Sequence, residues 1–131
     1  MAYLFKQGEL PSLIDAKQAR ERIFFVNQEL ANIDDMLAGV MYYKKDAASP
    51  LHLHKNCEHF YFIITGKATV ESDEGVRPVG PGDMIFIPAE EKHRLRATEP
   101  LFYFEWQAPN RFQTTNLEGP DDHLRWERNA G

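Results

Sequence analysis

The sequence contains a single cysteine, Cys57, which excludes an internal disulfide framework. This scarcity of cysteine fits a reducing compartment. Residues 1–15 also lack the sustained apolar stretch of a secretory signal. From these two absences we expect a cytoplasmic protein.

Long hydrophobic runs and clusters of basic residues are missing as well. The longest apolar run, residues 60–64, is far too short to cross a bilayer, so we expect no membrane association. The formal charge of −5 and the isoelectric point near 5.5 argue against binding of nucleic acid, which needs a clustered basic face. The partner that composition leaves open is a small-molecule substrate.

The length of 131 residues, with 43% hydrophobic and 27% charged residues, is typical of one globular domain. We therefore expect a single domain over residues 1–131. An N-terminal arm, residues 1–21, precedes the first strand signal, and Ser12 is a suitable N-cap for one or two helical turns within residues 11–23. The tail, residues 109–131, mixes turn residues with isolated aromatic residues and is expected to be irregular.

Short runs of β-branched and aromatic residues, bounded by Gly, Pro, Asp and Asn, follow one another along the chain. This spacing is typical of an all-β sandwich or barrel. The densest turn signal lies at residues 75–83, where proline and glycine would break a helix. We predict strands over residues 22–26, 37–44, 51–54, 59–65, 67–72, 84–88, 93–97 and 101–107.

The strand expected at residues 59–65 has apolar or aromatic side chains on both faces. A strand with one face in contact with water would alternate polar and apolar residues, so this pattern predicts burial on both sides. In a small domain such burial indicates two packed sheets, with a partner subunit on the outer one. We therefore expect a homodimer.

Three histidines lie within residues 51–59. His52 and His54 are two apart, so in a strand both project from one face, about 7 Å apart. The neighbouring strand offers Glu58 and His59, which have opposite parity. We favour His59 as the third metal ligand, because it shares a face with Tyr61, and we keep Glu58 as the fallback ligand.

A fourth histidine, His93, follows a strand bounded by Gly and Pro that could return it to the same place. A histidine taken singly is more often structural, and for His123 in the tail we prefer that interpretation. The joint placement of the other four predicts one divalent metal ion. Imidazole suits Zn, Cu, Fe and Ni, and an octahedral Mn or Fe ion would keep two positions open.

Two motifs in this region resemble those of the cupin superfamily, G-x5-H-x-H-x3-4-E-x6-G and G-x5-P-x-G-x2-H-x3-N. His52, His54 and Gly66 match the first motif. The second is matched by Gly82, Pro88 and His93. The motifs span residues 46–97, and the resemblance implies a small single-domain cupin with a jelly-roll β-barrel, the double-stranded β-helix.

Four positions depart from these motifs. Asp46 and Glu90 replace glycines, Ala97 replaces the final asparagine, and His59 stands at the glutamate position. The last change resembles the small four-histidine cupins, which often hold manganese. Four neutral imidazoles leave the full charge on the ion, which favours anionic or chelating ligands.

Strand parity also suggests the walls of a substrate pocket around the ion. Tyr61 is a candidate proton donor if it faces inward. The side chains expected to line an apolar, aromatic pocket are Ile63, Leu95, Phe104 and Trp106. Such a pocket would fit a small aromatic or enolisable compound.

The resemblance implies, as the leading function, a metal-dependent oxygenase of the dioxygenase type that acts on a small chelating substrate. One alternative is a non-redox lyase or isomerase, in which the metal polarises a carbonyl or carboxylate of a small acid or sugar. A module that only binds a small molecule is the other alternative. All three would use the same ligands.

Overall fold

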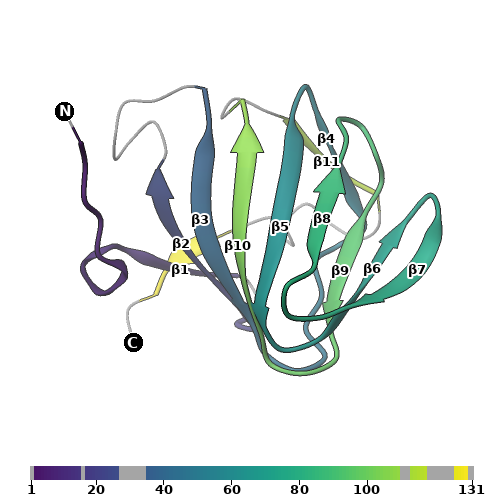
Figure 1. Cartoon of the computed structure of the whole chain (residues 1–131), viewed down its shortest axis with the longest axis horizontal. Coiled ribbons are helices and arrows are strands. Elements are labelled where there is room, and N and C mark those ends of the chain that lie inside the picture. The colour runs from purple at the N-terminus through teal and green to yellow at the C-terminus, as the bar shows by residue number, and fades with distance from the viewer. Residues whose placement is uncertain (1, 16, 27–34, 110–112, 118–125, 130–131) are drawn as a thin grey trace.

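The computed structural model describes residues 2–15, 17–26, 35–109, 113–117 and 126–129 (Figure 1). Among them are twelve β-strands and one short 3-10 turn, Gln7–Glu9. Seven strands form one antiparallel sheet, and their order across it is β12 (Trp126–Arg128), β1 (Ser12–Asp15), β2 (Arg20–Val26), β3 (Leu37–Tyr43), β10 (Leu101–Ala108), β5 (Glu58–Thr65) and β8 (Met84–Ile87).

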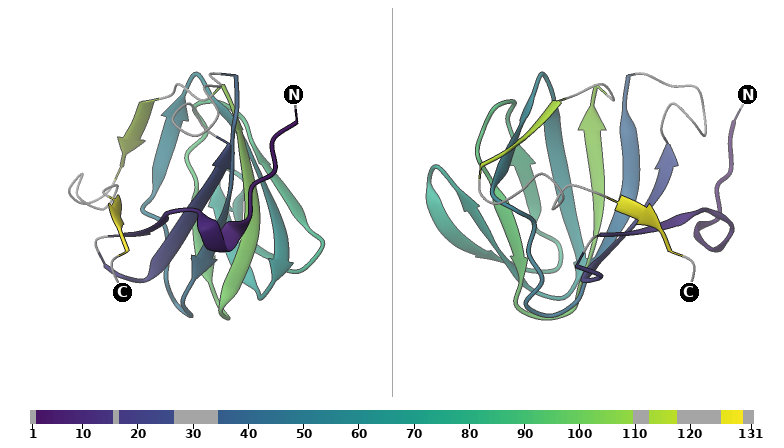
Figure 2. Two further views of the ribbon diagram at one scale, coloured as in Figure 1. Left: turned by 90° about the vertical axis from the view of Figure 1, so that its left-hand side faces the viewer. Right: turned by 180° about the vertical axis from the view of Figure 1, so that it is seen from behind.

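The remaining strands form a second layer opposite the large sheet (Figure 2). A three-stranded sheet has the order β7 (Gly75–Val79), β6 (Ala68–Ser72) and β9 (Arg94–Ala97), and β11 (Gln113–Asn116) pairs with β4 (His52–Lys55). Isolated bridges, one between Ala48 and Arg96 and one between His52 and His93, connect the two parts. The predicted all-β fold of two packed layers is confirmed.

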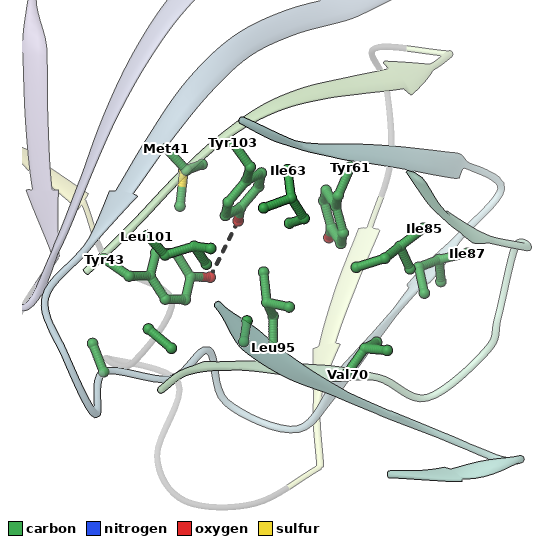
Figure 3. Close-up of a cluster of buried hydrophobic side chains, with 13 residues drawn as sticks. Met41, Tyr43, Tyr61, Ile63, Val70, Ile85, Ile87, Leu95, Leu101 and Tyr103 are labelled. Atoms are coloured by element: carbon green, nitrogen blue, oxygen red, sulfur yellow. Dashed lines mark hydrogen bonds between the residues drawn. The ribbon is translucent and has the colours of Figure 1, made fainter. Parts of the chain in front are cut away.

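Side chains from both layers meet in a buried core. Figure 3 shows Tyr61 and Ile63 of β5 and Tyr103 of β10 directed toward Leu95 and Val70 of the opposite layer. Ile63 is fully buried and Leu95 is 2% exposed. Burial of an aliphatic side chain of this size contributes about 2 kcal/mol relative to exposure. This core lies directly beside the histidines and fixes the distance between the two layers.

The helical turns predicted within residues 11–23 are wrong. These residues form β1 and the start of β2, which pair as an antiparallel hairpin. The Asp15 carboxylate closes the connection by accepting hydrogen bonds from the backbone N–H groups of Ala19, at 2.8 Å, and Arg20, at 3.2 Å. Pairing with β2 and β12 satisfies the backbone here, and it overrides the helical preference of the local sequence.

The tail was predicted to be irregular, yet its described residues contain two strands. β11 pairs with β4 and β12 pairs with β1, so each adds to an edge of an existing sheet. β7 was predicted only as a turn region. It is the edge strand of its sheet, where Pro78 needs no ladder hydrogen bond on its outer side.

Within the single chain, residues 59–65 are buried on one face only, and burial of the other face against a partner subunit stays a prediction. Along β5 the side chains of His59, Tyr61 and Ile63 are buried between the layers. Phe62 and Ile64 point to the other side of the sheet and are 39% and 40% exposed. The described residues include no helix that is long and apolar enough to span a membrane.

Candidate metal centre

Backbone pairing brings His52 and His54 of β4 close to His93, the residue that precedes β9. His52 and His93 exchange two backbone hydrogen bonds, N–H to O=C, at 3.1 and 2.9 Å. Their rings lie 4.2 Å apart between centroids, and the His54 ring lies 4.7 Å from that of His52. One ligand nitrogen from each of these three buried side chains falls within 4.8 Å of the others. His52, His54 and His93 therefore form a cluster that could hold a metal ion.

His59 and Glu58 point in opposite directions from the start of β5. His59 is 1% exposed, and its ring lies 4.1 Å from the His54 ring and 5.7 Å from the His93 ring. Glu58 is exposed on the outer side of the sheet. Four imidazoles thus meet between the layers. The role of His59 as a fourth ligand stays a prediction, because the three-nitrogen cluster does not include it.

Two of the rings are oriented by backbone carbonyls. Nδ1–H of His52 donates to the carbonyl oxygen of Pro50 at 2.6 Å, and Nδ1–H of His93 donates to that of Glu91 at 2.9 Å. A carbonyl can only accept, so the proton must sit on Nδ1, and Nε2 is left as the lone-pair nitrogen. Histidines that bind metals are commonly fixed in this way. The donor set therefore fits a transition metal.

Burial keeps these imidazoles neutral. Desolvation, with a smaller contribution from the charge of His93, lowers the pKa of His52 to about 3. Desolvation also lowers the pKa of His54 and of His59, and the neighbouring imidazoles lower both values further. The pKa of His93 is lowered by desolvation as well. Neutral imidazole is the form that coordinates a metal, so no proton must be displaced at neutral pH.

The histidines open onto a cavity of about 200 Å³ between the layers. Its wall includes an ion pair that sequence reasoning missed, in which Arg22 Nη2 lies 3.1 Å from Glu105 Oε1. On β10, Glu105 stands opposite Tyr61 and Gln107 opposite His59, and both face inward. The alternation of polar and aromatic residues along β10 is visible in the sequence. What the sequence does not reveal is that Arg22, far away in the chain, supports a buried carboxylate.

Phe104 and Trp106 do not line this cavity, so that prediction is wrong. Both lie on the outer face of the large sheet and border an apolar groove with Phe60, Phe62 and Met84. Because β10 is paired on both sides, its parity is set by its neighbours, and only one of its two faces can enter the core. The inner face carries Leu101 and Tyr103 in the hydrophobic core, and Glu105 and Gln107 follow on the same face at the cavity.

Of the other predicted pocket residues, Leu95 lines the histidine cavity. Ile63 lies deeper, in the core. Tyr61 does face inward, and its hydroxyl oxygen is 3.4 Å from His59 Nδ1 and 3.5 Å from His93 Nε2. Burial raises the pKa of Tyr61 well above its usual value, so the hydroxyl keeps its proton at neutral pH.

Cys57 lies beside the cluster, with Sγ 3.3 Å from His59 Nε2. Burial, together with the negative charge of Glu105, raises the pKa of the thiol to about 11. It is therefore a protonated thiol at neutral pH and a poor nucleophile. His123 falls outside the described residues.

The order of strands, the positions of the histidines and the two-layer barrel all agree with one family of proteins. The model of the Cupin domain family matches residues 39–106. The chain belongs to the cupin family. No curated protein shows a significant match to the sequence of this cupin.

Solved structures of similar fold cover most of this cupin. KdgF from Halomonas sp. aligns with a TM-score of 0.74 at 20% identity, over 85% of this chain and 96% of that one. The polyketide cyclase RemF from Streptomyces resistomycificus aligns with a TM-score of 0.76 at 21% identity, over 94% and 90%. A cupin sugar phosphate isomerase from Silicibacter pomeroyi aligns with a TM-score of 0.72 at 14% identity, over 89% and 94%. These likenesses confirm the jelly-roll fold expected from the motifs.

Proposed function

We propose that this cupin is a metal-dependent enzyme that moves a proton on a small enolisable carbonyl compound or acid. The observation that supports it is the composition of one buried cavity. That cavity is lined by His52, His54 and His59 and also by the Tyr61 hydroxyl and the ion-paired carboxylate of Glu105. The names of two similar structures, a cyclase and an isomerase, are consistent with chemistry of this kind.

The residues that would hold the ion are His52, His54 and His93, with His59 as the fourth ligand. A divalent ion in this place supplies a Lewis acid that polarises a substrate carbonyl or carboxylate oxygen.

One side chain of the cavity can donate a proton to the substrate and another can accept one from it. Tyr61 keeps its proton because it is buried, so it donates a hydrogen bond or a proton to a substrate oxygen. Glu105 stands opposite Tyr61 on the neighbouring strand, and its carboxylate can accept a proton. Arg22 holds that carboxylate in place at 3.1 Å. A donor and an acceptor of protons thus lie side by side on adjacent strands in the wall of one cavity.

The experiment is proton exchange without oxygen. Metal-loaded protein is incubated in D2O under argon with pyruvate, oxaloacetate or acetylacetone, and exchange of the carbon-bound protons is followed by NMR. We expect exchange with at least one of these compounds, and loss of it when the metal is removed. Tyr61→Phe should slow exchange about 100-fold. Tyr42→Phe, which changes a tyrosine stacked on Phe102 of β10, is the control.

An oxygenase of the dioxygenase type is the second candidate. Its support is the exposure of Glu58, which leaves an all-imidazole donor set without a carboxylate. Substrate-dependent oxygen uptake with catechols or β-dicarbonyls, without proton exchange, would favour the oxygenase and overturn the first proposal. If neither reaction occurs with any compound, a binding module becomes the better account.

A further inference from the structure

A second cavity, of about 420 Å³, lies next to the histidine cavity and is rich in cationic side chains. The two cavities share Arg20, Ser49 and Pro50 in their walls. Asp15 and Asp46 are the only carboxylates among the described residues that line it. Its cationic lining residues are Lys17, Arg20, Lys44, Lys45, Arg94 and Arg96.

The fold brings these cationic residues together from separate parts of the chain. The chain has fifteen Lys and Arg residues and a formal charge of −5, with no cluster of basic residues in its sequence. The six cations come from the hairpin between β1 and β2, from the segment after β3 and from β9. A concave, positively charged site on an acidic protein raises the local concentration of anions.

The six cationic side chains are not equally available to an anionic ligand. Arg20 is paired with Asp15 at 2.8 Å, and Arg94 with Glu71 at 3.2 Å, so these two build the wall. Lys17, Lys44 and Lys45 are exposed, and no described carboxylate lies within 4.0 Å of their ammonium groups. Arg96 donates to the carbonyl oxygen of Asp46 at 3.5 Å, which leaves its charge uncompensated.

The segments that present these charges are tied to one another. Lys44 N–H donates to Ala19 O at 2.9 Å, and Asp46 N–H donates to Ala97 O at 2.9 Å. Gln18 and Asp46, which neighbour Lys17 and Lys45, have positive φ angles of 54° and 71°. Non-glycine residues adopt this conformation rarely, and they do so mainly where the surrounding structure imposes it. A held backbone lowers the entropy lost when a ligand binds.

We propose that this cavity binds the phosphate group of a small molecule. A phosphate group carries about two negative charges and several acceptor oxygens. Lysine and arginine side chains recognise these oxygens by charge-assisted hydrogen bonds. The Ser49 hydroxyl oxygen accepts from Leu95 N–H at 3.0 Å, so its own O–H remains to donate into the cavity. The site stands on its own and does not depend on the metal or on the reaction.

The test is calorimetric titration of inorganic phosphate into the metal-free full-length protein at low ionic strength. We expect saturable binding of one phosphate per chain. The double variant Lys45→Gln/Arg96→Gln should bind about tenfold more weakly. Lys67→Gln/Arg77→Gln removes two cations that do not line the cavity and should bind as the wild type does. Melting curves verify that both variants fold.

Three further titrations sharpen the result. His54→Ala should keep phosphate binding, because the proposed site is separate from the histidines. Glucose 6-phosphate that binds tighter than phosphate, while glucose does not bind, would identify a phosphorylated metabolite as the ligand; equal or weaker binding would identify free phosphate. The proposal is overturned if phosphate does not saturate, if both double variants lose affinity equally, if His54→Ala abolishes binding, or if citrate binds more tightly than phosphate.

Discussion

At the scale of residues, the buried carboxylate of Asp15 is stabilised by a partner of opposite charge, Arg20. The Asp15 carboxylate receives hydrogen bonds from the guanidinium of Arg20 and from the backbone of Ala19. Burial alone would raise the pKa of Asp15, but the hydrogen bonds and the positive charge of Arg20 outweigh it and lower the pKa below 3.8. For the histidines burial dominates instead, lowering the pKa of each imidazole and keeping it neutral.

Asp15→Asn tests this balance. A carboxyl group whose pKa is lower in the folded than in the unfolded chain stabilises the fold above its unfolded pKa, and this contribution is lost as the pH falls through the folded value. We expect the variant to lose about 3 kcal/mol of unfolding free energy near pH 7, because Arg20 stays buried without its partner. The difference from wild type should shrink as the pH falls below 3.8.

Urea denaturation of both proteins from about pH 7 to about pH 3 measures this difference. The exposed Asp73→Asn serves as the control and should change little. A deficit that is the same at every pH would contradict the account, because it would show that the ionised form of Asp15 is not what stabilises the hairpin.

At the scale of elements, the turn after β5 helps to place His59. His59 is the second residue of β5, which ends at Thr65, and the next residue, Gly66, has a φ of 89°. A Cβ built on Gly66 would collide with the carbonyl oxygen of Pro100. Glycine is therefore required twice, for its conformation and for the close approach of the segment that leads into β10.

Gly66→Ala should cost at least ~2 kcal/mol of unfolding free energy, from the positive φ and the collision together. Gly75→Ala is a matched control, because Gly75 also has a positive φ, of 101°, yet its Cβ would meet nothing within 4 Å. It should cost only about 1 kcal/mol. Denaturant unfolding compares them, and equal losses would show that the contact with Pro100 is unimportant.

The sequence was informative where a strand has strong local character. All eight predicted strands exist, with ends shifted by at most two residues, because alternation and turn residues mark them. Four strands were missed: β1, β7, β11 and β12. β11 and β12 are short strands at sheet edges that pair with β4 and β1, which are remote in the chain. The turn residues of β7 and the helical preference of the segment around β1 hid the other two. The inner face of β10 was misjudged because hydrophobicity favoured Phe104, whereas the inner face combines Tyr103 of the core with Glu105, whose ion-pair partner Arg22 is remote in the chain.

At the scale of the molecule, the outer face of the large sheet presents an apolar groove bordered by Phe60, Phe62, Met84, Phe104 and Trp106. Phe104 is 39% exposed and Met84 is 61% exposed. Contiguous exposed apolar surface of this kind commonly marks an interface between proteins. The homodimer expected from the sequence stays a prediction, and this groove is where we place its interface.

Light scattering coupled to gel filtration tests the dimer. We expect the wild-type chain to elute with the mass of two chains and Phe62→Lys to elute as a folded monomer, because a charge would be buried at the interface. Val76→Lys is the control, since Val76 is 63% exposed on β7, away from the groove. A monomeric wild type, or a dimer unaffected by Phe62→Lys, would contradict this placement.

The proposed reaction depends on the metal, so metal content is its most direct test. Elemental analysis of protein purified without added metal should find about one divalent transition-metal ion per chain, since three buried, neutral imidazoles bind such ions well. His52→Ala and His93→Ala should abolish the metal, and His59→Ala should weaken its binding. Glu58→Gln should retain it. A wild-type protein that takes up no stoichiometric metal, even when it is offered, would contradict the account, as would loss of metal in Glu58→Gln.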